Sequence, residues 1–262
     1  MNKKIAIIGC GNLGLSILRG LLEEKNIKPD SITATKRNTE SIIKYSEAGV
    51  KITSNNIEAV KNSELVILAL KPYNILNIIK EIKPVLNEKH IIVSLASGIT
   101  ISQIKEIIPE QKAIFRAMPN TAADVKESLT CIATENANPE DIETVKSFFN
   151  ILGNSVVIGE ELMAAATVLG ACGIAYVMRF MRAMVQGGIQ IGFDSKTAST
   201  IVNQTVLGAA QLLIERKNHP EFEIDKVTTP RGCTIVGLNE MEHNGFSSSL
   251  IKGIVSSYKE IG

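Results

Sequence analysis

The chain of 262 residues has no tryptophan, and aromatic residues make up only 4% of it. So few aromatic side chains offer little from which to build the base-stacking platforms of nucleic-acid-binding proteins. The net charge is +1, from 28 Lys and Arg against 27 Asp and Glu, so the protein has no overall attraction to nucleic acid or to an anionic membrane. We therefore expect neither as a partner, and any anion must be recognised locally.

Long hydrophobic runs and clustered cysteines are also missing. No apolar run reaches the roughly 18–20 residues that span a bilayer, and Ile5–Ile8 is shorter than the roughly 7–15 apolar residues of a signal peptide. Cys10, Cys131, Cys172 and Cys233 lie far apart without a Cys-x-x-Cys motif, which argues against a metal centre and against a disulfide framework. We expect a soluble protein in a reducing cytoplasm.

What the sequence does contain begins with an apolar run that ends in a glycine-spaced turn, Gly9-Cys10-Gly11-Asn12-Leu13-Gly14. This spacing between a strand and a helix is typical of dinucleotide binding. Gly9 allows a tight turn, Gly11 lets the backbone approach a pyrophosphate, and Gly14 lets the helix pack on the strand. The helix offers its first N–H groups and its positive dipole end to the phosphates. We expect Gly9, Gly11, Asn12, Leu13 and Gly14 to bind the cofactor.

The residues after the next predicted strand, 31–35, bear on which dinucleotide binds. NAD-binding versions of this motif place an acid there to hold the ribose hydroxyls, whereas a basic residue accommodates a 2′-phosphate. This chain has Lys36-Arg37-Asn38 and no acid at the end of the strand. The spacing favours NADPH/NADP, with NADH as a weaker cofactor, over a merely solvated basic loop.

Strand and helix patterns alternate over the first 159 residues. Further strands are predicted at residues 50–53, 65–69, 91–95, 113–117, 129–133 and 156–158, and helices at 41–47, 56–61, 74–83, 100–108 and 139–152. This alternation predicts an α/β fold with a Rossmann-type, doubly wound, mainly parallel sheet. Ligands bind such sheets beyond the carboxyl ends of the strands, so Gly9, Lys36 and residues 70–72 and 96–98 should border one crevice.

From Glu160 onward only helical patterns remain. Residues 162–192 are apolar on more than one face, and a second long helix follows an Asp194-Ser195 cap. A helix that is apolar all round must be covered on every side, and about a hundred residues offer little cover. We therefore predict a domain at 1–159 that binds NADP and an all-helical domain at 160–262 that dimerises and binds substrate.

A second constellation lies near the end of the chain, in Thr228-Thr229-Pro230-Arg231-Gly232-Cys233-Thr234, which leads into a helix. A helix entry with small residues presents backbone N–H groups and, with hydroxyls beside them, suits a small carboxylate. The residues alone leave open whether the loop binds a ligand or only caps a helix, for which Thr228 or Thr229 would suffice.

Together these features resemble the pyrroline-5-carboxylate reductases, the NADPH-dependent enzymes that make proline, over essentially the whole chain. The marks of the resemblance are G-C-G-N-L-G, A-L-K-P at residues 69–72, S-L-A-S-G at 94–98, M-P-N-T at 118–121, Q-T-V-L-G-A-A at 204–210 and T-T-P-R-G-C-T at 228–234. The family implies a Rossmann domain and an intertwined helical homodimer in which partner helices complete each active site. Assembly beyond the dimer stays open.

The resemblance also implies roles for individual residues. The 2′-phosphate would be surrounded by Lys36, Arg37 and Asn56. The nicotinamide side would be lined by Ala69, Leu70, Lys71, Pro72, Leu95, Ala96 and Ser97, and Lys226 would also contact the cofactor. The substrate-binding residues would be Glu160, Thr229, Gly232, Cys233 and Thr234.

The implied reaction is the reduction of 1-pyrroline-5-carboxylate to L-proline by hydride transfer to the ring imine, the last step of proline biosynthesis. Thr234 is our candidate catalytic residue, hydrogen-bonded to the ring nitrogen. His90, His219 and His243 are interpreted as structural, because none is better placed as an acid.

Some positions depart from the family pattern. Residues 170–176 read G-A-C-G-I-A-Y where most members have S-G-S-G-P-A-Y, and Arg231 and Cys233 replace a usual glycine and threonine. We expect Arg231 to point into solvent.

Two alternative functions remain: a related NADP-dependent reductase of another cyclic imine or an oxo acid, and a non-catalytic sensor that binds NADP(H). Comparing the turnover of 1-pyrroline-5-carboxylate with that of other imines would distinguish the first alternative from a pyrroline-5-carboxylate reductase. Cofactor binding without turnover would support the second.

Overall fold

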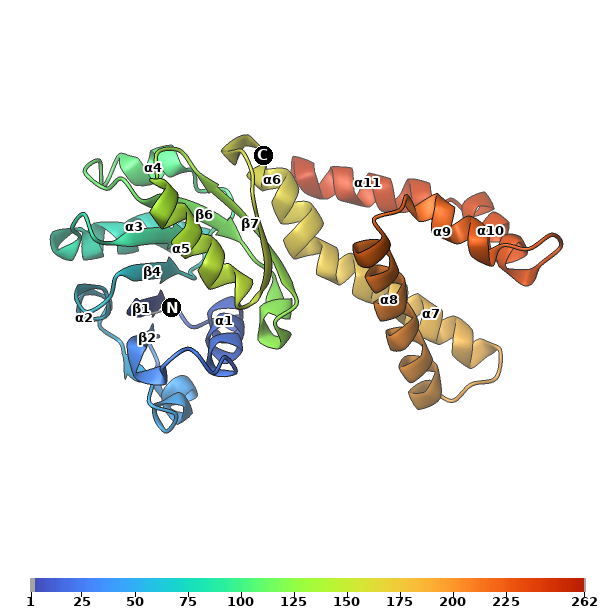
Figure 1. Cartoon of the computed structure of the whole chain (residues 1–262), viewed down its shortest axis with the longest axis horizontal. Coiled ribbons are helices and arrows are strands. Elements are labelled where there is room, and N and C mark those ends of the chain that lie inside the picture. The colour runs from blue at the N-terminus through green and yellow to red at the C-terminus, as the bar shows by residue number, and fades with distance from the viewer. Residues whose placement is uncertain (1–2, 262) are drawn as a thin grey trace. The chain divides into compact units, whose positions relative to one another are not determined.

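The computed structural model describes residues 3–261. Two compact units are present: the first runs up to Cys172 and also includes the chain from Glu260, and the second is Gly173–Lys259 (Figure 1). The first unit is α/β. The second contains only helices, as the loss of strand patterns after Glu160 predicts.

The first unit is built on a single sheet. Its strands are β1 (Ile5–Ile8), β2 (Ile32–Thr35), β3 (Lys51–Thr53), β4 (Leu65–Leu68), β5 (Ile91–Ser94), β6 (Ile114–Met118), β7 (Ser128–Thr134) and β8 (Gly153–Val157). Its α-helices are α1 (Asn12–Leu22), α2 (Asn56–Lys61), α3 (Pro72–Ile82), α4 (Ile101–Lys105), α5 (Pro139–Asn150) and α6 (Met163–Ala166). Short 3₁₀ turns η1 (Pro29–Ser31), η2 (Glu40–Ser46), η3 (Lys83–Val85), η4 (Thr121–Val125) and η5 (Glu160–Leu162) and a π-helix, η6 (Thr167–Cys172), complete it.

The central strands of the sheet run parallel, so their carboxyl ends lie at the same edge of the sheet. Within residues 3–261 the sheet has eight strands in the order β3-β2-β1-β4-β5-β6-β7-β8, and every neighbouring pair is parallel except β6 and β7. Ile8 is in register with Thr35 on one side and with Leu68 on the other, and Leu68 with Ser94. The predicted doubly wound, mainly parallel sheet is confirmed, and its ligand-binding edge is the edge where these four residues lie.

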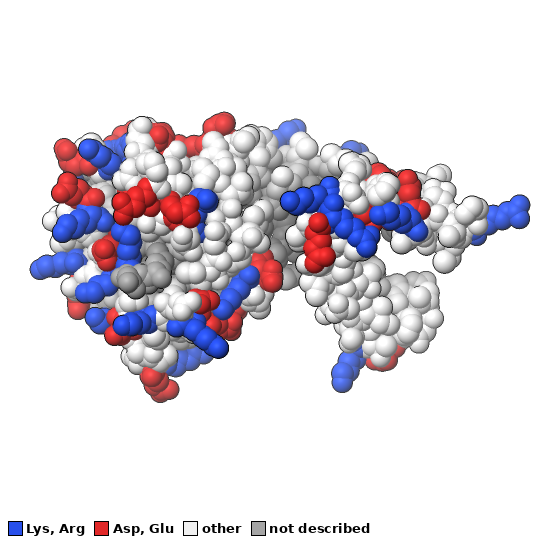
Figure 2. All heavy atoms as spheres, viewed as in Figure 1, with Lys and Arg blue, Asp and Glu red and all other residues white. Residues whose placement is uncertain are grey.

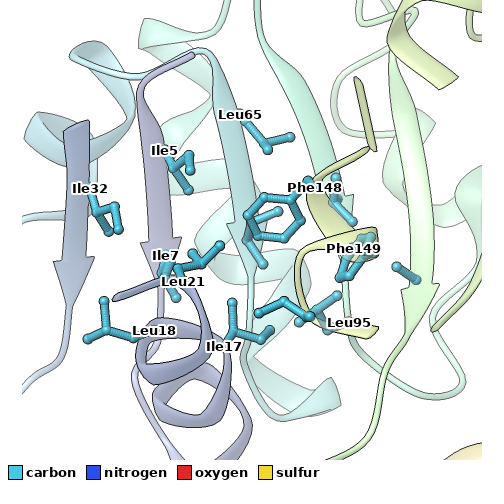
Figure 3. Packing of buried hydrophobic residues seen from close by; sticks show 14 of the residues in the cluster. Ile5, Ile7, Ile17, Leu18, Leu21, Ile32, Leu65, Leu95, Phe148 and Phe149 are labelled. Carbon is cyan, nitrogen blue, oxygen red and sulfur yellow. The ribbon is translucent and has the colours of Figure 1, made fainter. Parts of the chain in front are cut away.

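Hydrophobic side chains cover both faces of the sheet, because successive residues of a strand point to opposite sides. Ile5 and Ile7 of β1 belong to one buried cluster with residues of α1 and α5, whereas Ala6 and Ile8 belong to a second cluster with residues of α3 and α4. Figure 3 shows part of the first cluster, in which Phe148 lies over the strands. Each large apolar side chain buried in this way contributes about 1.5–3 kcal/mol.

Two predicted helices differ from the observed ones. The helix expected at 41–47 is the 3₁₀ segment η2, in which only Ile42 is buried, so it lacks the apolar stripe that would stabilise a longer α-helix. The helix expected to reach Ile108 ends at Lys105. Its start is as predicted: Thr100 is the N-cap and forms a capping box with Gln103.

The helical unit contains α7 (Gly173–Gln190), α8 (Ser195–Arg216), α9 (Pro220–Val227), α10 (Cys233–His243) and α11 (Phe246–Lys259). Asp194 caps α8 as predicted, accepting from the backbone N–H groups of Lys196 and Thr197. Hydrogen bonding from the side chain and then the backbone of Thr197 lowers the pKa of its carboxyl group. The pair α7 and α8 packs closely, since a Cβ atom at Gly188 would lie 3.2 Å from that of Ala198.

One long apolar helix begins at Glu160. Glu160–Gln190 forms a run of 31 residues, with a mean hydropathy of 1.6 in its most apolar window, which is long and apolar enough to cross a membrane by length and composition. Only 17% of that window is buried within the chain. Figure 2 shows few charged side chains over α7 and α8 on the face in view. The helix therefore needs a cover that the single chain does not provide.

Candidate functional site

The glycine turn is held by the end of β2. The backbone N–H of Gly9 donates to the carbonyl and to the hydroxyl of Thr35, both at 3.2 Å, and that of Cys10 donates to the same carbonyl at 2.8 Å. Gly9 has a φ of +95°, a conformation that residues with a Cβ atom rarely adopt. A Cβ atom at Gly14 would lie 2.5 Å from the carbonyl oxygen of Gly9, so helix and turn touch only because Gly14 has none.

The second glycine of the turn, Gly11, faces open space. A Cβ atom at Gly11 would have no heavy atom within 4 Å, and Gly11 is exposed. Gly11 is also the N-cap of α1, which has neither a side-chain cap nor an acidic residue in its first turn. In contrast α2, α4, α5, α8 and α9 are each capped by a side chain. The turn thus fits a pyrophosphate, which would find room at Gly11 and N–H groups at the start of α1.

Beside the turn, the end of β2 forms a polar network. The Thr35 hydroxyl donates to Oδ1 of Asn56, the first residue of α2, at 2.8 Å, and Nδ2 of Asn56 donates to Glu81 of α3 at 3.3 Å. Lys36 follows β2 directly, and its backbone N–H donates to the carbonyl of Thr53. The predicted residues Lys36, Arg37 and Asn56 therefore lie around the end of one strand, where the sequence placed the 2′-phosphate.

The predicted nicotinamide side follows the two neighbouring strands. The backbone N–H of Ala69 donates to the carbonyl of Ile8, and that of Leu95 donates to the carbonyl of Leu68. A Cβ atom at Gly9 would meet the Leu70 side chain and, at 2.9 Å, the carbonyl oxygen of Ala69. The sheet thus brings the segments Ala69-Leu70-Lys71-Pro72 and Leu95-Ala96-Ser97 to the same edge as the glycine turn. Their roles toward a cofactor stay predictions.

Glu160, a predicted substrate residue, is engaged by the α/β unit. Its Oε1 accepts from Nη1 of Arg116 in β6 at 3.0 Å and from the backbone N–H of Ile101, the first residue of α4, at 2.7 Å. The exposed fraction of the two side chains is 21% for Glu160 and 7% for Arg116. Oε1 of Glu160 therefore has a structural role. The predicted contact with the substrate, which stays a prediction, would have to be made by Oε2.

Arg116 was missed by the reasoning from sequence. It is a lone charged residue in an otherwise apolar strand, which is the signal that could have revealed it, because charged residues are rarely buried without a partner. Its Nε atom has no hydrogen-bond partner within residues 3–261. The guanidinium group therefore depends on Glu160 for its compensating charge.

Replacing Arg116 with methionine is expected to lower the free energy of unfolding by about 1–3 kcal/mol, because it leaves the half-buried Glu160 carboxylate without its cation. The double variant Arg116→Met/Glu160→Leu should recover most of this loss. Urea denaturation followed by circular dichroism measures both. Equal midpoints for the single and double variants would show that the two charges are not coupled.

A further contact missed from sequence secures the π-helix η6. Nδ2 of Asn120, in the Met118-Pro119-Asn120-Thr121 segment after β6, donates to the carbonyl of Gly170 at 3.0 Å. A π-helix displaces carbonyls from the regular ladder, and such segments often occur at functional sites. This one includes residues 170–172, the beginning of the stretch 170–176 that departs from the family pattern.

In the helical unit, the second constellation forms a tight turn before α10. The backbone N–H of Gly232 donates to the carbonyl of Thr229 at 2.9 Å, with Pro230 and Arg231 at the centre of the turn. Arg231 has a φ of +60° and is exposed, as expected. A positive φ at this third turn position favours glycine, which explains physically why the family pattern has one there.

The start of α10 resembles that of α1. Its N-cap is Gly232, without a side-chain hydrogen bond, and its first turn contains no acid, so neither Thr228 nor Thr229 is the cap that the structural alternative required. The Thr228 hydroxyl instead donates back to the carbonyls of Ile224 and Asp225. Within the described residues the hydroxyl of Thr234, the second residue of α10, has no hydrogen-bond partner. The start of α10 therefore has room to serve a ligand, and the roles of Thr229, Gly232, Cys233 and Thr234 toward a substrate stay predictions.

Lys226, a predicted cofactor contact, has partners within α9. Its Nζ lies 2.9 Å from Oε1 of Glu223 and 4.2 Å from the centre of the Phe222 ring. Asn218, Lys226 and Arg216 all reach Glu223, and these hydrogen bonds lower the pKa of Glu223 to about 2. A cofactor contact by Lys226 would compete with this ion pair.

The cysteines and histidines fit structural roles in different ways. Burial raises the pKa of the Cys10 thiol to about 12, so Cys10 is a packed thiol in the glycine turn. Cys233, in contrast, is exposed at the start of α10. His90 is buried between the backbone N–H of Asn87 and the carbonyl of Val60, and His219 caps α9.

Comparison with known proteins shows which family the chain belongs to. The model of the family described as pyrroline-5-carboxylate reductase dimerisation matches residues 160–261, and the model described as NADP oxidoreductase, coenzyme F420-dependent, matches residues 4–98. Pyrroline-5-carboxylate reductase 2 of Dictyostelium discoideum is 42% identical over 272 residues, with 98% of this chain and 91% of that protein covered. The chain belongs to the pyrroline-5-carboxylate reductase family.

Other members extend this result. Pyrroline-5-carboxylate reductase 1 of Dictyostelium discoideum is 45% identical over 97% of this chain, which spans 48% of the length of that relative. The crystal structure of the Plasmodium falciparum pyrroline carboxylate reductase with NADP bound has a TM-score of 0.88 at 26% identity, covering 99% of this chain and 97% of that one. The predicted family and the predicted fold class, a Rossmann-type domain followed by a helical dimerisation domain, are confirmed.

The boundary between the two domains stays a prediction. The reductase dimerisation model begins at residue 160, next to the predicted boundary at 159, whereas the compact helical unit begins at Gly173. The difference covers η5, α6 and η6. Residues of this segment, such as Met163, pack against Met118 and Ala133 of the sheet, which is why it groups with the α/β unit.

Proposed function

We propose that this member of the family reduces 1-pyrroline-5-carboxylate to L-proline with NADPH, the last step of proline biosynthesis. The observation that carries the proposal is the 42% identity to a pyrroline-5-carboxylate reductase over nearly the full length of both chains. The starts of α1 and α10 support it, because neither has a side-chain cap or an acidic residue in its first turn, and each leaves N–H groups for an anion.

The α/β unit binds the cofactor along the edge of the sheet. Gly9, Gly11 and Gly14 hold the pyrophosphate with Asn12 and Leu13, and Lys36, Arg37 and Asn56 surround the 2′-phosphate. The nicotinamide side is lined by residues 69–72 and 95–97, and Lys226 gives a further contact. When bound, NADPH supplies the hydride that reduces the ring carbon of the imine. NADH, which has no 2′-phosphate to meet the basic pair, is the weaker cofactor.

The start of α10 binds the substrate. Backbone N–H groups at Gly232 and Cys233 receive the carboxylate, with Thr229 and Glu160 beside it. The hydroxyl of Thr234 forms a hydrogen bond with the ring nitrogen. This hydrogen bond orients the imine carbon and stabilises the nitrogen as it becomes an amine. Positioning of this kind contributes several kcal/mol without a stronger acid.

The assembly we propose is a homodimer with intertwined helices. The exposed apolar run Glu160–Gln190 supports this, because the dimerisation family model starts at its first residue and a second copy would cover its apolar surface. We propose no membrane and no nucleic-acid partner. The four cysteines are free, which fits the reducing cytoplasm that we propose as its location.

Replacing Lys36 with glutamine is expected to weaken NADPH binding about three- to tenfold and to leave NADH binding within about twofold, because one phosphate contact to a cation contributes about 1 kcal/mol at an exposed site. Fluorescence titration with each cofactor measures both constants. Lys89→Gln, at the opposite edge of the sheet, is the matched control. Equal losses for NADPH and NADH would contradict the role of Lys36.

The proposed reaction is tested by following NADPH oxidation with 1-pyrroline-5-carboxylate and identifying the product by chiral chromatography. L-Proline should form in equal amount to the NADPH oxidised. Faster turnover of another cyclic imine or of a small oxo acid would favour the related-reductase alternative. Tight NADPH binding without turnover of any imine would favour a sensor.

A further inference from the structure

An acidic side chain reaches the nucleotide edge from an element that the sequence motif does not include. Glu81 lies near the end of α3, and its Oε1 accepts from Nδ2 of Asn56 at 3.3 Å. Asn56 in turn accepts from the Thr35 hydroxyl at 2.8 Å. A chain of hydrogen bonds therefore joins the end of β2 to a carboxylate 46 positions later in the sequence, since Thr35 and Glu81 share the Asn56 carboxamide.

This carboxylate is close enough to affect an anion at the end of β2. The carboxamide of Asn56 is about 2.3 Å across, so the Glu81 oxygen lies at most about 8–9 Å from the Thr35 hydroxyl. That distance is about one Debye length at physiological ionic strength, so the charge is felt there. Within residues 3–261 no Lys or Arg forms an ion pair with Glu81 that would neutralise it.

The carboxylate also fixes the orientation of Asn56. A carboxylate only accepts hydrogen bonds, so Nδ2 must face Glu81 and Oδ1 must face the Thr35 hydroxyl. The network thus has a defined direction, and a neutral glutamine at position 81 could keep it through its own amide oxygen. Charge and hydrogen bonding at this position can therefore be separated by a single substitution.

We propose that Glu81 is a specificity-determining residue that restrains the preference of the enzyme for 2′-phosphorylated cofactors. The basic pair Lys36-Arg37 attracts the 2′-phosphate, and the carboxylate of Glu81 opposes it across Asn56. The acid that NAD-binding motifs carry at the end of the second strand is thus replaced by one that comes from α3. The inference rests on the proposed function, because it takes the 2′-phosphate to lie at this edge.

The test compares Glu81→Gln with wild type by calorimetric titration of two fragments, 2′,5′-ADP and 5′-AMP, which need no turnover. Coulomb's law in water predicts that 2′,5′-ADP binds the variant about two- to fivefold more tightly, because a dianion placed beside the Thr35 hydroxyl, about 8 Å from the Glu81 carboxylate, no longer meets a negative charge. Binding of 5′-AMP should stay within the error of the measurement. Glu88→Gln, in the loop before β5 at the opposite edge of the sheet, is the control and should change neither.

The salt dependence distinguishes charge from orientation. The gain of Glu81→Gln should shrink as ionic strength rises from about 0.05 to 0.5 M, since the interaction is screened. A gain that does not shrink, or an unchanged or weaker affinity for 2′,5′-ADP, would overturn the role of Glu81 while leaving the proposed function intact. If wild type itself binds 2′,5′-ADP no better than 5′-AMP, the proposed NADPH site is what fails, and the inference fails with it.

Discussion

Replacing Gly11 with alanine is expected to weaken NADPH binding at least tenfold and to leave the melting temperature of the free protein unchanged. A Cβ atom at Gly11 meets no protein atom within 4 Å, so the free fold has room for it. The same Cβ would occupy the space through which the backbone approaches the pyrophosphate. Fluorescence titration gives the affinity, and differential scanning fluorimetry without cofactor gives the melting temperature.

The matched substitution at Gly14 should affect the stability of the free protein, which the substitution at Gly11 leaves unchanged. A Cβ atom there would lie 2.5 Å from the carbonyl oxygen of Gly9, which is backbone and cannot rotate away. Gly14→Ala is therefore expected to lower the melting temperature by several degrees, in the range of a strained core substitution of about 1–3 kcal/mol.

The outcome that would contradict this account concerns Gly11. If Gly11→Ala binds NADPH like wild type, the pyrophosphate does not lie at this turn.

The second large effect concerns Thr234. Thr234→Ala is expected to lower kcat/KM for 1-pyrroline-5-carboxylate by about ten- to a thousandfold, as for the loss of a positioned hydrogen-bond partner of the reacting group. The hydroxyl has no partner within the described residues, so its removal breaks no bond of the fold, and NADPH affinity and melting temperature should stay unchanged. Steady-state kinetics at saturating NADPH measure the loss.

Two variants make this experiment decisive. Thr234→Ser keeps the hydroxyl and should recover most of the activity. Thr228→Ala removes a hydroxyl of the same loop that is bonded to the carbonyls of Ile224 and Asp225, and it should retain near wild-type kcat/KM. Wild-type kinetics for Thr234→Ala would remove Thr234 from the mechanism.

Much of the α/β unit could be predicted because its signals are local. The helix expected at residues 56–61 is α2. In the helical unit, the cap expected at Asp194 is likewise the one observed. The glycine turn was predictable for the same reason, since Gly9 and Gly14 are each explained by a close contact within the turn or with the residues after the neighbouring strand β4. Strand direction was less evident. The antiparallel pair β6 and β7 follows from a connection, from Met118 to Ser128, that is too short for a parallel crossover.

What the sequence could not reveal depends on contacts between distant residues. Arg116 and Glu160 are separated by 44 positions and pair only because β6 lies beside the start of η5. The link from Thr35 through Asn56 to Glu81 joins three elements that periodicity treats independently. The left-handed conformation of Arg231 was hidden because a residue other than glycine occupies it.

The two helix starts also show how structure adds to a motif. In the sequence, the loop before α10 could equally have been a cap supplied by Thr228 or Thr229. The structure gives the N-cap to Gly232 and turns the Thr228 hydroxyl back onto α9, which removes the simpler explanation. The substrate role of this loop stays a proposal, and it now has a geometric reason in addition to a resemblance.

The most direct test of the account is a steady-state assay of the purified protein with 1-pyrroline-5-carboxylate and each cofactor in turn. The account predicts oxidation of both, formation of L-proline, and a kcat/KM several-fold or more higher for NADPH than for NADH. A higher value for NADH would contradict the role given to Lys36 and Arg37. Absence of turnover with both cofactors, in a protein that still binds NADPH, would contradict the proposed reaction itself.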